Sequence, residues 1–260
     1  MQPPLLEISD LSATYIEDGH YLLALQDVNL QVNPGEFVCL IGPSGSGKSS
    51  LLDVITGLFP ESHGSVKIGG KSTPPQKRPG LTAYMRQRDL LMPWRTAVEN
   101  AALALEVHGV STNSAREIAA SRFAEFGLAG FEQSYPAQLS GGMRQRVAFL
   151  RTVLADRDLL LLDEPFGALD ALNRVTMQQW LVQMWEHQQQ GVVMVTHDVE
   201  EAVFLADRVV VLSSRPGTVI HEEKIDLPRP RTRTMVTDAA FLRHREALLG
   251  ALGLLEGGDV

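Results

Sequence analysis

The chain has 260 residues, of which 44% are apolar and 21% are charged, and its formal net charge is −8 at pH 7. A chain of this size can bury a full hydrophobic core, and its negative charge argues against a protein that grips nucleic acid through the phosphates. No apolar stretch reaches the ~18 residues of a membrane-spanning helix, and the start at Met1 has no basic and apolar leader, so we expect a chain that is neither membrane-spanning nor exported.

Residues 5–41 alternate short apolar runs with turn residues. Period-two alternation over 28–32, followed by the break at 33–35, predicts antiparallel strands that lead into a buried strand at 37–41. The single cysteine, Cys39, lies in that last strand and is expected to be a buried thiol rather than part of a disulfide. Tyr15 lies earlier in this region, where its ring either stacks on an adenine or simply packs in a small sheet.

The apolar run 37–41 leads into a stretch with the pattern G-x-x-x-x-G-K-S, and a helical segment follows it. This order is typical of a loop that holds polyphosphates, because the glycines let backbone N–H groups point at the anion and the helix start adds partial positive charge. We expect Lys48 to reach the β- and γ-phosphates and the Ser49 hydroxyl to hold Mg²⁺. The predicted nucleotide-binding residues here are Gly42, Pro43, Ser44, Gly45, Ser46, Gly47, Lys48, Ser49 and Ser50.

Beyond the loop, an exposed connection is expected at 74–80 and a strand at 81–85, with Gln87 just past the strand end. Ligand-facing side chains occupy such positions in open α/β sheets, although a glutamine there is usually only solvated. From about residue 91 to 155 the pattern becomes helical, with a capping box at 96–99 and a second helix over 116–126. Ser140, Gly141 and Gly142 open a further helix, either as a second anion site or as an ordinary serine cap.

A continuous apolar run at 159–162 predicts a strand buried on both faces that ends in Asp163 and Glu164. Asp163 can bind Mg²⁺ through water, and Glu164 can polarise the water that attacks a γ-phosphate. A helix is expected over 171–188, and the next buried strand, 192–196, delivers His197, which can hydrogen-bond a γ-phosphate or that water. The basic segment 227–233 is more typical of a solvated linker than of a nucleic-acid site.

In order and spacing, these motifs resemble the ATP-binding-cassette (ABC) ATPases. The discriminating element is L-S-G-G at 139–142, which other phosphate-loop families lack. The resemblance implies an α/β fold with a P-loop NTPase core of mainly parallel sheet, an N-terminal antiparallel β subdomain and an inserted helical subdomain. It covers one domain over 1–260, with the core and β subdomain at 5–90 and 156–220, the helical subdomain at 91–155 and a short C-terminal extension at 221–260.

The resemblance also implies roles for single residues, with ATP and Mg²⁺ as cofactors. Catalysis would use Glu164, His197, Gln87 and Lys48, and Mg²⁺ would be held by Ser49, Gln87 and Asp163. Tyr15 would stack on adenine. Ser140, Gly141 and Gly142 would complete the ATP site of a second copy in a head-to-tail dimer, and Asp170, in the A-L-D run at 168–170, would communicate across that dimer.

Within the family, R-D-L-L-M-P-W after Gln87, S-S-R-P-G at 213–217 and L-P-R-P-R at 227–231 are similar to importers of the nitrate, sulfonate, taurine and pyrimidine-precursor group. This implies a peripheral ATPase at the cytoplasmic face of the inner membrane. Its partners would be permease subunits, docked near 87–107, and indirectly an extracytoplasmic substrate-binding protein, with no nucleic acid. The alternative is a soluble ABC ATPase that acts on nucleic acid or ribosomes.

Overall fold

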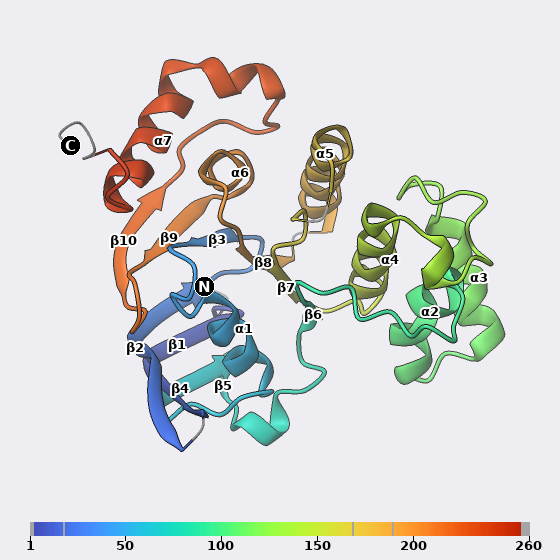
Figure 1. The fold of residues 1–260 in the computed structure, drawn as a ribbon, viewed down its shortest axis with the longest axis horizontal. Coiled ribbons are helices and arrows are strands. Elements are labelled where there is room, and N and C mark those ends of the chain that lie inside the picture. Colours follow the sequence, from blue (N-terminus) through green and yellow to red (C-terminus); the bar gives the residue numbers. More distant parts are fainter. Residues whose placement is uncertain (1–2, 18, 168, 189, 256–260) are drawn as a thin grey trace.

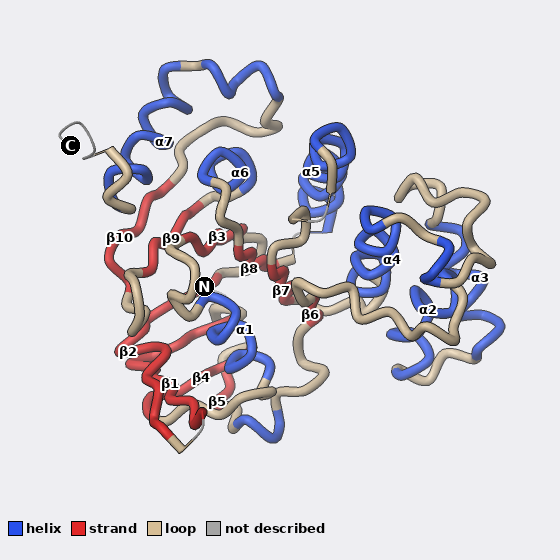
Figure 2. Tube along the Cα trace, viewed as in Figure 1, coloured by secondary structure: helices blue, strands red, loops and turns tan. Residues whose placement is uncertain are grey.

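The structure is a computed structural model that describes residues 3–17, 19–167, 169–188 and 190–255 (Figure 1). Its strands form one six-stranded and one four-stranded sheet, and helices surround the larger sheet (Figures 1 and 2). This mixed architecture confirms the predicted fold class. No helix in the described ranges is both long and apolar enough to cross a membrane.

The six-stranded sheet runs in the order β10-β9-β3-β8-β7-β6. Its first five strands along the chain are mutually parallel, and β10 pairs antiparallel with β9 at one edge. Parallel strands end at the same edge of a sheet, so the segments that follow β3, β6, β7 and β8 come together there. The strands are β3 (Phe37–Ile41), β6 (Ala83–Met85), β7 (Leu159–Asp163), β8 (Gly191–Val195), β9 (Arg208–Leu212) and β10 (Val219–Lys224).

β10 was not predicted from the sequence. Its residues alternate between half-buried and exposed positions, and four consecutive polar or charged side chains occupy 221–224. Such residues have low strand propensity, and this edge strand forms because β9 offers it a pairing partner.

Both faces of this sheet are covered, as its continuous apolar strands predict. Alternate side chains of β3 point to opposite faces: Phe37 and Cys39 join a core with the helices on one side, while Val38 and Leu40 join a second core on the other side. Cys39 is completely buried with a free thiol, as predicted, and its burial raises the pKa of that thiol well above its ordinary value.

The four-stranded sheet has the order β2-β1-β4-β5 and is antiparallel throughout. It consists of β1 (Leu6–Glu17), β2 (His20–Val32), β4 (His63–Ile68) and β5 (Lys71–Ser72). Helix α1 (Lys48–Thr56) packs between this sheet and the six-stranded one, since its apolar side chains share a core with β1, β2 and one face of β3, β7 and β8 (Figure 1). The helix that begins at the glycine-rich loop is therefore held on two sides.

Helices α2 (Ala97–Val107), α3 (Thr112–Arg122) and α4 (Gly141–Val153) gather beyond β6, at the far end of the sheet from β10 (Figure 1). The predicted capping box is present: the Thr96 hydroxyl accepts the Glu99 N–H at 3.4 Å, and the Glu99 carboxylate accepts the Thr96 N–H at 2.9 Å. α3 begins at Thr112 and ends at Arg122, whereas the prediction was 116–126. Past Arg122 the N–H groups of Phe123 and Phe126 donate to carbonyls three residues back, so tighter turns replace the α-helix.

Helices α5 (Ala171–Gln188), α6 (Val199–Leu205) and α7 (Ala239–Ala251) lie on the other face of the sheet from α1 (Figure 1). The bounds of α5 are those predicted. Within the described ranges, short 3₁₀ turns connect elements at Pro75–Lys77, Pro136–Gln138 and Arg233–Thr237.

Two segments that were predicted to be solvated connections are anchored by buried arginines. In 74–80, the Arg78 side chain is 1% exposed and forms a bidentate pair with the Glu61 carboxylate, at 2.6 and 2.8 Å. In 227–233, Arg231 is 6% exposed and donates to carbonyls at the end of α6. The prediction of exposure was wrong at both arginines, because each guanidinium caps the C-terminal carbonyls of a helix.

Candidate active site

The glycine-rich loop joins β3 to α1 at the edge where the parallel strands end. Gly47, the residue before α1, has φ 91°, and a Cβ there would lie 2.7 Å from a methyl carbon of Leu25 and 2.9 Å from the Ala24 carbonyl oxygen. Only glycine fits this left-handed position against β2. No side chain caps the start of α1, so its free N–H groups remain available to an anion.

The Lys48 ammonium folds back over the loop. It donates to the carbonyl oxygens of Gly42 and Pro43, both at 2.8 Å, and to the buried Ser46 hydroxyl at 3.1 Å. Burial lowers the pKa of Lys48, while the nearby Glu164 and Asp163 carboxylates act in the opposite direction. These neutral acceptors are weaker partners than phosphate oxygens, so the cation is poised to move to a bound phosphate.

The two carboxylates at the end of β7 have different surroundings. The Asp163 side chain is buried and accepts a hydrogen bond from the Ser49 hydroxyl at 3.0 Å. Burial raises the pKa of Asp163, and the Glu164 charge adds to the rise. The Glu164 side chain faces the cavity. Its backbone is in the left-handed conformation (φ 47°), and this conformation is held by the Glu164 N–H, which donates to the Val195 carbonyl at 3.0 Å. This conformation costs a residue other than glycine roughly 1–2 kcal/mol, a strain typical of functional positions.

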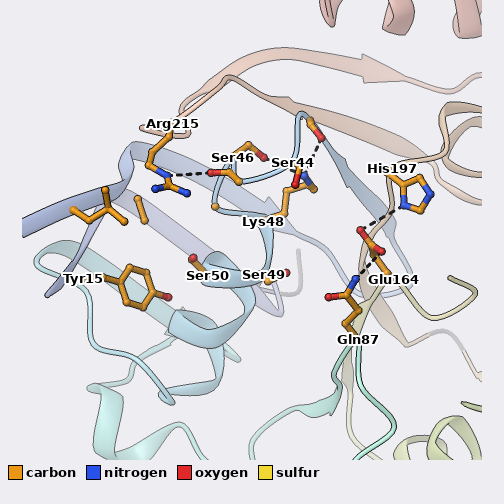
Figure 3. A pocket seen from close by; sticks show the side chains of 15 residues that line it. Tyr15, Ser44, Ser46, Lys48, Ser49, Ser50, Gln87, Glu164, His197 and Arg215 are labelled. Carbon is orange, nitrogen blue, oxygen red and sulfur yellow. Dashed lines mark hydrogen bonds and ion pairs between the residues drawn. The ribbon is translucent and has the colours of Figure 1, made fainter. Parts of the chain in front are cut away.

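Two polar side chains hold the Glu164 carboxylate from opposite sides (Figure 3). The Gln87 amide nitrogen donates to Oε2 at 3.0 Å, and His197 Nδ1 lies 3.4 Å from Oε1. Gln87 follows β6 and His197 follows β8, so three strand ends deliver these groups to one point. The structure thus brings together Gln87, Glu164 and His197, which the sequence singled out separately.

These groups lie at one end of a cavity of about 500 Å³, a size that suits a small-molecule ligand. Tyr15 lies at the other end, on the far side of the loop from Glu164 (Figure 3). One face of its ring stacks on Phe59, with centroids 3.9 Å apart and planes 19° apart. Burial raises the pKa of the Tyr15 phenol, and a hydrogen bond with Ser50 opposes the rise. The other lining residues are Leu22, Ala24, Gly42, Ser44, Gly45, Ser46, Gly47, Lys48, Ser49, Ser50 and Arg215.

Several predicted site residues do not line this cavity. The start of α4 is separated from the loop by the width of several strands (Figure 1), and Ser140, Gly141, Gly142 and Asp170 are all outside the lining. The Ser140 hydroxyl caps α4 by accepting the Met143 N–H at 3.2 Å, and Asp170 accepts the Asn173 N–H at 3.0 Å at the start of α5. Ala168, in the same A-L-D run, lies outside the described residues. Pro43 does not line the cavity either, and its carbonyl oxygen accepts hydrogen bonds from Lys48 at 2.8 Å and from the Ser46 N–H at 3.2 Å.

Three lining residues were missed by sequence reasoning: Leu22, Ala24 and Arg215. Leu22 on β2 lies opposite Tyr15 on β1. The length of this hairpin was therefore the only feature of the sequence that could have identified Leu22 as a lining residue. Arg215 comes from the turn between β9 and β10, which packs against the loop from far along the chain. Only the S-S-R-P-G turn pattern pointed to it, and that pattern carries no ligand chemistry of its own.

The donor set suits Mg²⁺ together with a nucleotide. Mg²⁺ takes oxygen ligands, commonly one or two from protein, with phosphates and water supplying the rest. Ser49 and Asp163 present a hydroxyl and a carboxylate oxygen 3.0 Å apart beside the loop. Within the described residues no group of three or more His, Cys, Asp or Glu side chains could hold a metal by itself.

A parallel sheet with a phosphate loop after β3 and a carboxylate at the end of β7 defines the class of P-loop nucleoside triphosphatases. The family described as ABC transporter matches residues 25–167. The chain is 42% identical to the nitrate import ATP-binding protein NrtD of Synechocystis, over 88% of this chain and 87% of that protein. It is 40% identical to the taurine import ATP-binding protein TauB of Escherichia coli (strain K12), over 94% and 96%.

Among solved structures, the dimeric ATP-binding cassette MJ0796 in a post-hydrolysis state with ADP and Pi matches with a TM-score of 0.78. The identity is 32%, over 86% of this chain and 100% of that one. The chain belongs to the ABC transporter family, as its motifs predicted, and it is an ATP-binding, ATP-hydrolysing subunit.

Proposed function

We propose that ATP occupies the cavity around the loop, with its adenine against the open face of Tyr15 and its phosphates along residues 42–50. The support is the order of groups in the cavity: an aromatic ring at one end, the free N–H groups of α1 in the middle, and polar catalytic groups at the other end. In this proposal Lys48 leaves the loop carbonyls and contacts the β- and γ-phosphates.

Glu164 is the proposed general base. It takes a proton from the water that attacks the γ-phosphorus, while Gln87 orients that water and His197 hydrogen-bonds the γ-phosphate. The observation that carries this assignment is the Glu164 carboxylate held between the Gln87 amide and His197 Nδ1. Such a clamp fixes the carboxylate in one orientation before substrate arrives, which is what a positioned base requires.

Ser49, Asp163 and Gln87 are the proposed Mg²⁺ residues. These residues would hold the ion beside the phosphates of ATP, where it would supply positive charge against the charge that develops on the phosphate oxygens. Ser49 would bind through its hydroxyl, and the buried Asp163 would orient that hydroxyl or a metal-bound water. Gln87 can serve this role as well as water positioning, because its amide has both an oxygen and a nitrogen.

A second copy of this chain is the proposed source of the remaining contacts to ATP. Ser140, Gly141 and Gly142 form a helix start that does not line its own chain's cavity, and its first two residues are exposed. The dimeric MJ0796 cassette, bound to ADP and Pi, supports a dimeric arrangement. In a head-to-tail dimer, each L-S-G-G would close the cavity of the other chain, and Asp170 would lie at the shared interface. ATP closes this dimer, and hydrolysis lets it open.

The proposed role of the dimer is to energise import of a small anionic or heterocyclic solute. The relatives named for nitrate and taurine import support this over action on nucleic acid or ribosomes, which is not favoured. The chain would sit as a peripheral subunit at the cytoplasmic face of the inner membrane, beneath permease subunits and indirectly served by a substrate-binding protein. The residues near 87–107 would dock the permease.

Affinity purification of the tagged chain from detergent-solubilised membranes tests this role. We expect an apolar multi-span protein to co-purify, and the variant Trp94→Glu to lose it, because Trp94 is 72% exposed within the proposed docking surface. Tyr21→Glu is the matched control, since Tyr21 is 80% exposed on the β1–β2 hairpin. Purification with RNA or DNA alone would overturn the importer proposal in favour of its alternative.

A further inference from the structure

Arg215 is a cation at the rim of the nucleotide cavity, and none of the site roles predicted above includes it. It lies in the turn between β9 and β10, and its guanidinium Nε donates to the Gly45 carbonyl oxygen of the loop at 3.3 Å. In Figure 3 its side chain lies on the Tyr15 side of the loop, whereas Glu164, Gln87 and His197 lie on the other side. The cavity therefore has two positively charged groups along its length, Lys48 in the loop and Arg215 at the rim.

The turn that carries Arg215 is fixed against the loop. The Gly217 N–H donates to the Ala24 carbonyl at 2.9 Å, and the Gln26 N–H donates to the Gly217 carbonyl at 3.0 Å, so the turn joins the edge of β2. A Cβ at Gly217 would lie 1.9 Å from the Ser46 carbonyl oxygen. This contact leaves room only for glycine, and it sets the distance between the turn and the phosphate loop.

The Arg215 side chain itself has weak partners. It is exposed, and none of the ion pairs found among the described residues includes it. In the part of the chain that the structure describes, its hydrogen-bond partner is a loop carbonyl, and Lys48 likewise donates to loop carbonyls. A guanidinium binds phosphate oxygens in shorter and stronger charge-assisted hydrogen bonds than it makes with a carbonyl.

We propose that Arg215 binds the phosphate chain of the nucleotide at its end nearest the ribose, opposite Lys48. The assignment rests on the proposed placement of ATP in this cavity, where the Tyr15 side holds the nucleoside and the Lys48 side holds the terminal phosphates. Lining cations Lys48 and Arg215 outnumber the lining carboxylate Glu164, which is the charge balance that an anionic ligand requires. Arg215 thus contributes to affinity for ADP and ATP alike and has no part in the hydrolytic step.

Isothermal titration of the full chain with ADP tests the proposal. For Arg215→Ala we expect the dissociation constant to rise about tenfold at low salt, with the loss shrinking as salt screens the charge. Arg215→Lys should bind within about threefold of wild type, because it keeps the charge but loses the planar fork.

Two further variants separate the possible outcomes. Arg243→Ala removes an exposed arginine on α7 and should bind ADP as wild type does. Lys48→Ala should lose ADP binding; if it does not, the nucleotide is not in this cavity and the proposed function fails. If Lys48→Ala loses binding while Arg215→Ala binds ADP normally, only the Arg215 proposal is overturned. A defect in ATP-driven dimerisation with unchanged ADP affinity would likewise overturn it, by making Arg215 a contact to the second copy.

Discussion

Helices α1 and α4 each follow a small residue, Gly47 or Ser140, yet their first turns differ. α1 begins after Gly47 with no side-chain cap, beside the buried Ser46 and Lys48, at the floor of a cavity. α4 begins after Ser140, whose hydroxyl already occupies one of the free N–H groups, and Ser140 and Gly141 are exposed. The first helix start is enclosed and lies beside an ammonium group, whereas the second is open to solvent.

The difference shows what each helix start can bind by itself. At α1, the loop N–H groups, the helix dipole and Lys48 can act together, so we expect one chain to hold an anion there by itself. At α4 the dipole and the remaining N–H groups act in water, where such an end contributes only about 0.3–1 kcal/mol. The α4 start therefore gains strength only when another surface excludes water from it. This asymmetry supports the proposed site shared between two copies, and the predictions below test its two halves.

The largest expected effect is on Glu164, in the enclosed half. Glu164→Gln should bind ATP, remain dimeric and lose turnover by roughly 10²–10⁴-fold, because a positioned base has that effect on rate. The amide keeps the size and the hydrogen-bond capacity of the side chain but does not accept a proton from water. Steady-state phosphate release measures turnover, and light scattering with ATP measures the dimer.

The matched control is Glu117→Gln, an exposed carboxylate on α3 among the helices that carry α4. Its turnover should equal that of wild type. Turnover of Glu164→Gln within about threefold of wild type would show that Glu164 is not the base.

The second prediction concerns the open half. Ser140→Asp keeps a good N-cap residue but places a negative charge where the γ-phosphate of the other chain is expected. Turnover and ATP-driven dimerisation should fall by about 10²-fold, comparable with the loss of one transition-state donor. ADP affinity should be unchanged, because the α1 cavity does not include Ser140. Lys48→Ala, by contrast, should lose both turnover and ADP affinity.

Ser111→Asp is the control for this substitution. Ser111 caps α3 as Ser140 caps α4, since its hydroxyl accepts the Ser114 N–H at 3.3 Å. The same added charge at that helix start should leave turnover unaltered. If Ser140→Asp weakened ADP binding by an isolated chain, the two helix starts would belong to one site, and the asymmetry drawn above would be wrong.

The sequence predicted the enclosed half well because its chemistry is local. Residues 37–56 form a strand, a loop and a helix in one uninterrupted stretch, and the residue types there leave few alternatives. Gln87, Glu164 and His197 could be placed at strand ends from apolar runs alone. That their side chains would meet at one carboxylate depends on the strand order β8-β7-β6, which no local pattern encodes.

Sequence reasoning failed where long charged side chains are buried. Arg78 and Arg231 lie in proline-rich segments that are typical of exposed connections, yet both are buried as caps on helix carbonyls. Periodicity carries no signal for such a position, since the carbonyls that bind the guanidinium come from elements distant in the chain. Arg215 was missed for a related reason: its turn meets the phosphate loop only after the sheet has formed.

The third prediction tests how firmly α1 is held. Arg78 ties the Val54 carbonyl at the end of α1 to the Glu61 carboxylate, so Glu61→Gln leaves a buried guanidinium without its counter-charge. We expect a loss of about 2 kcal/mol in the free energy of unfolding at pH 7. Urea denaturation measures it. Glu7→Gln, which breaks the partly exposed pair with Lys67, should cost no more than about 0.5 kcal/mol.

The pH dependence of that loss has a definite sign. Burial by itself would raise the pKa of Glu61, but its hydrogen bonds with Arg78 and the nearby positive charge leave the pKa below its ordinary value of 4.5. The stabilisation is therefore complete above pH 4.5 and is lost as the pH falls through the lower folded-state pKa. The difference in unfolding free energy between wild type and Glu61→Gln should shrink as the pH falls through the folded-state pKa of Glu61. A constant difference in unfolding free energy from pH 7 to pH 3 would show that the ion pair between Arg78 and Glu61 does not contribute to stability.

The smallest effect is expected at Tyr15, the part of the enclosed half farthest from the reacting phosphate. Its ring has Phe59 on one face, so the other face can stack on adenine without reorganisation. Tyr15→Ala should raise the ADP dissociation constant about tenfold, while Tyr15→Phe should stay within about twofold, because base stacking depends on the ring. Tyr21→Ala, on the exposed part of the same hairpin, should have no effect. If Tyr15→Phe binds as weakly as Tyr15→Ala, the hydroxyl and its Ser50 contact, rather than the ring, hold the nucleoside end.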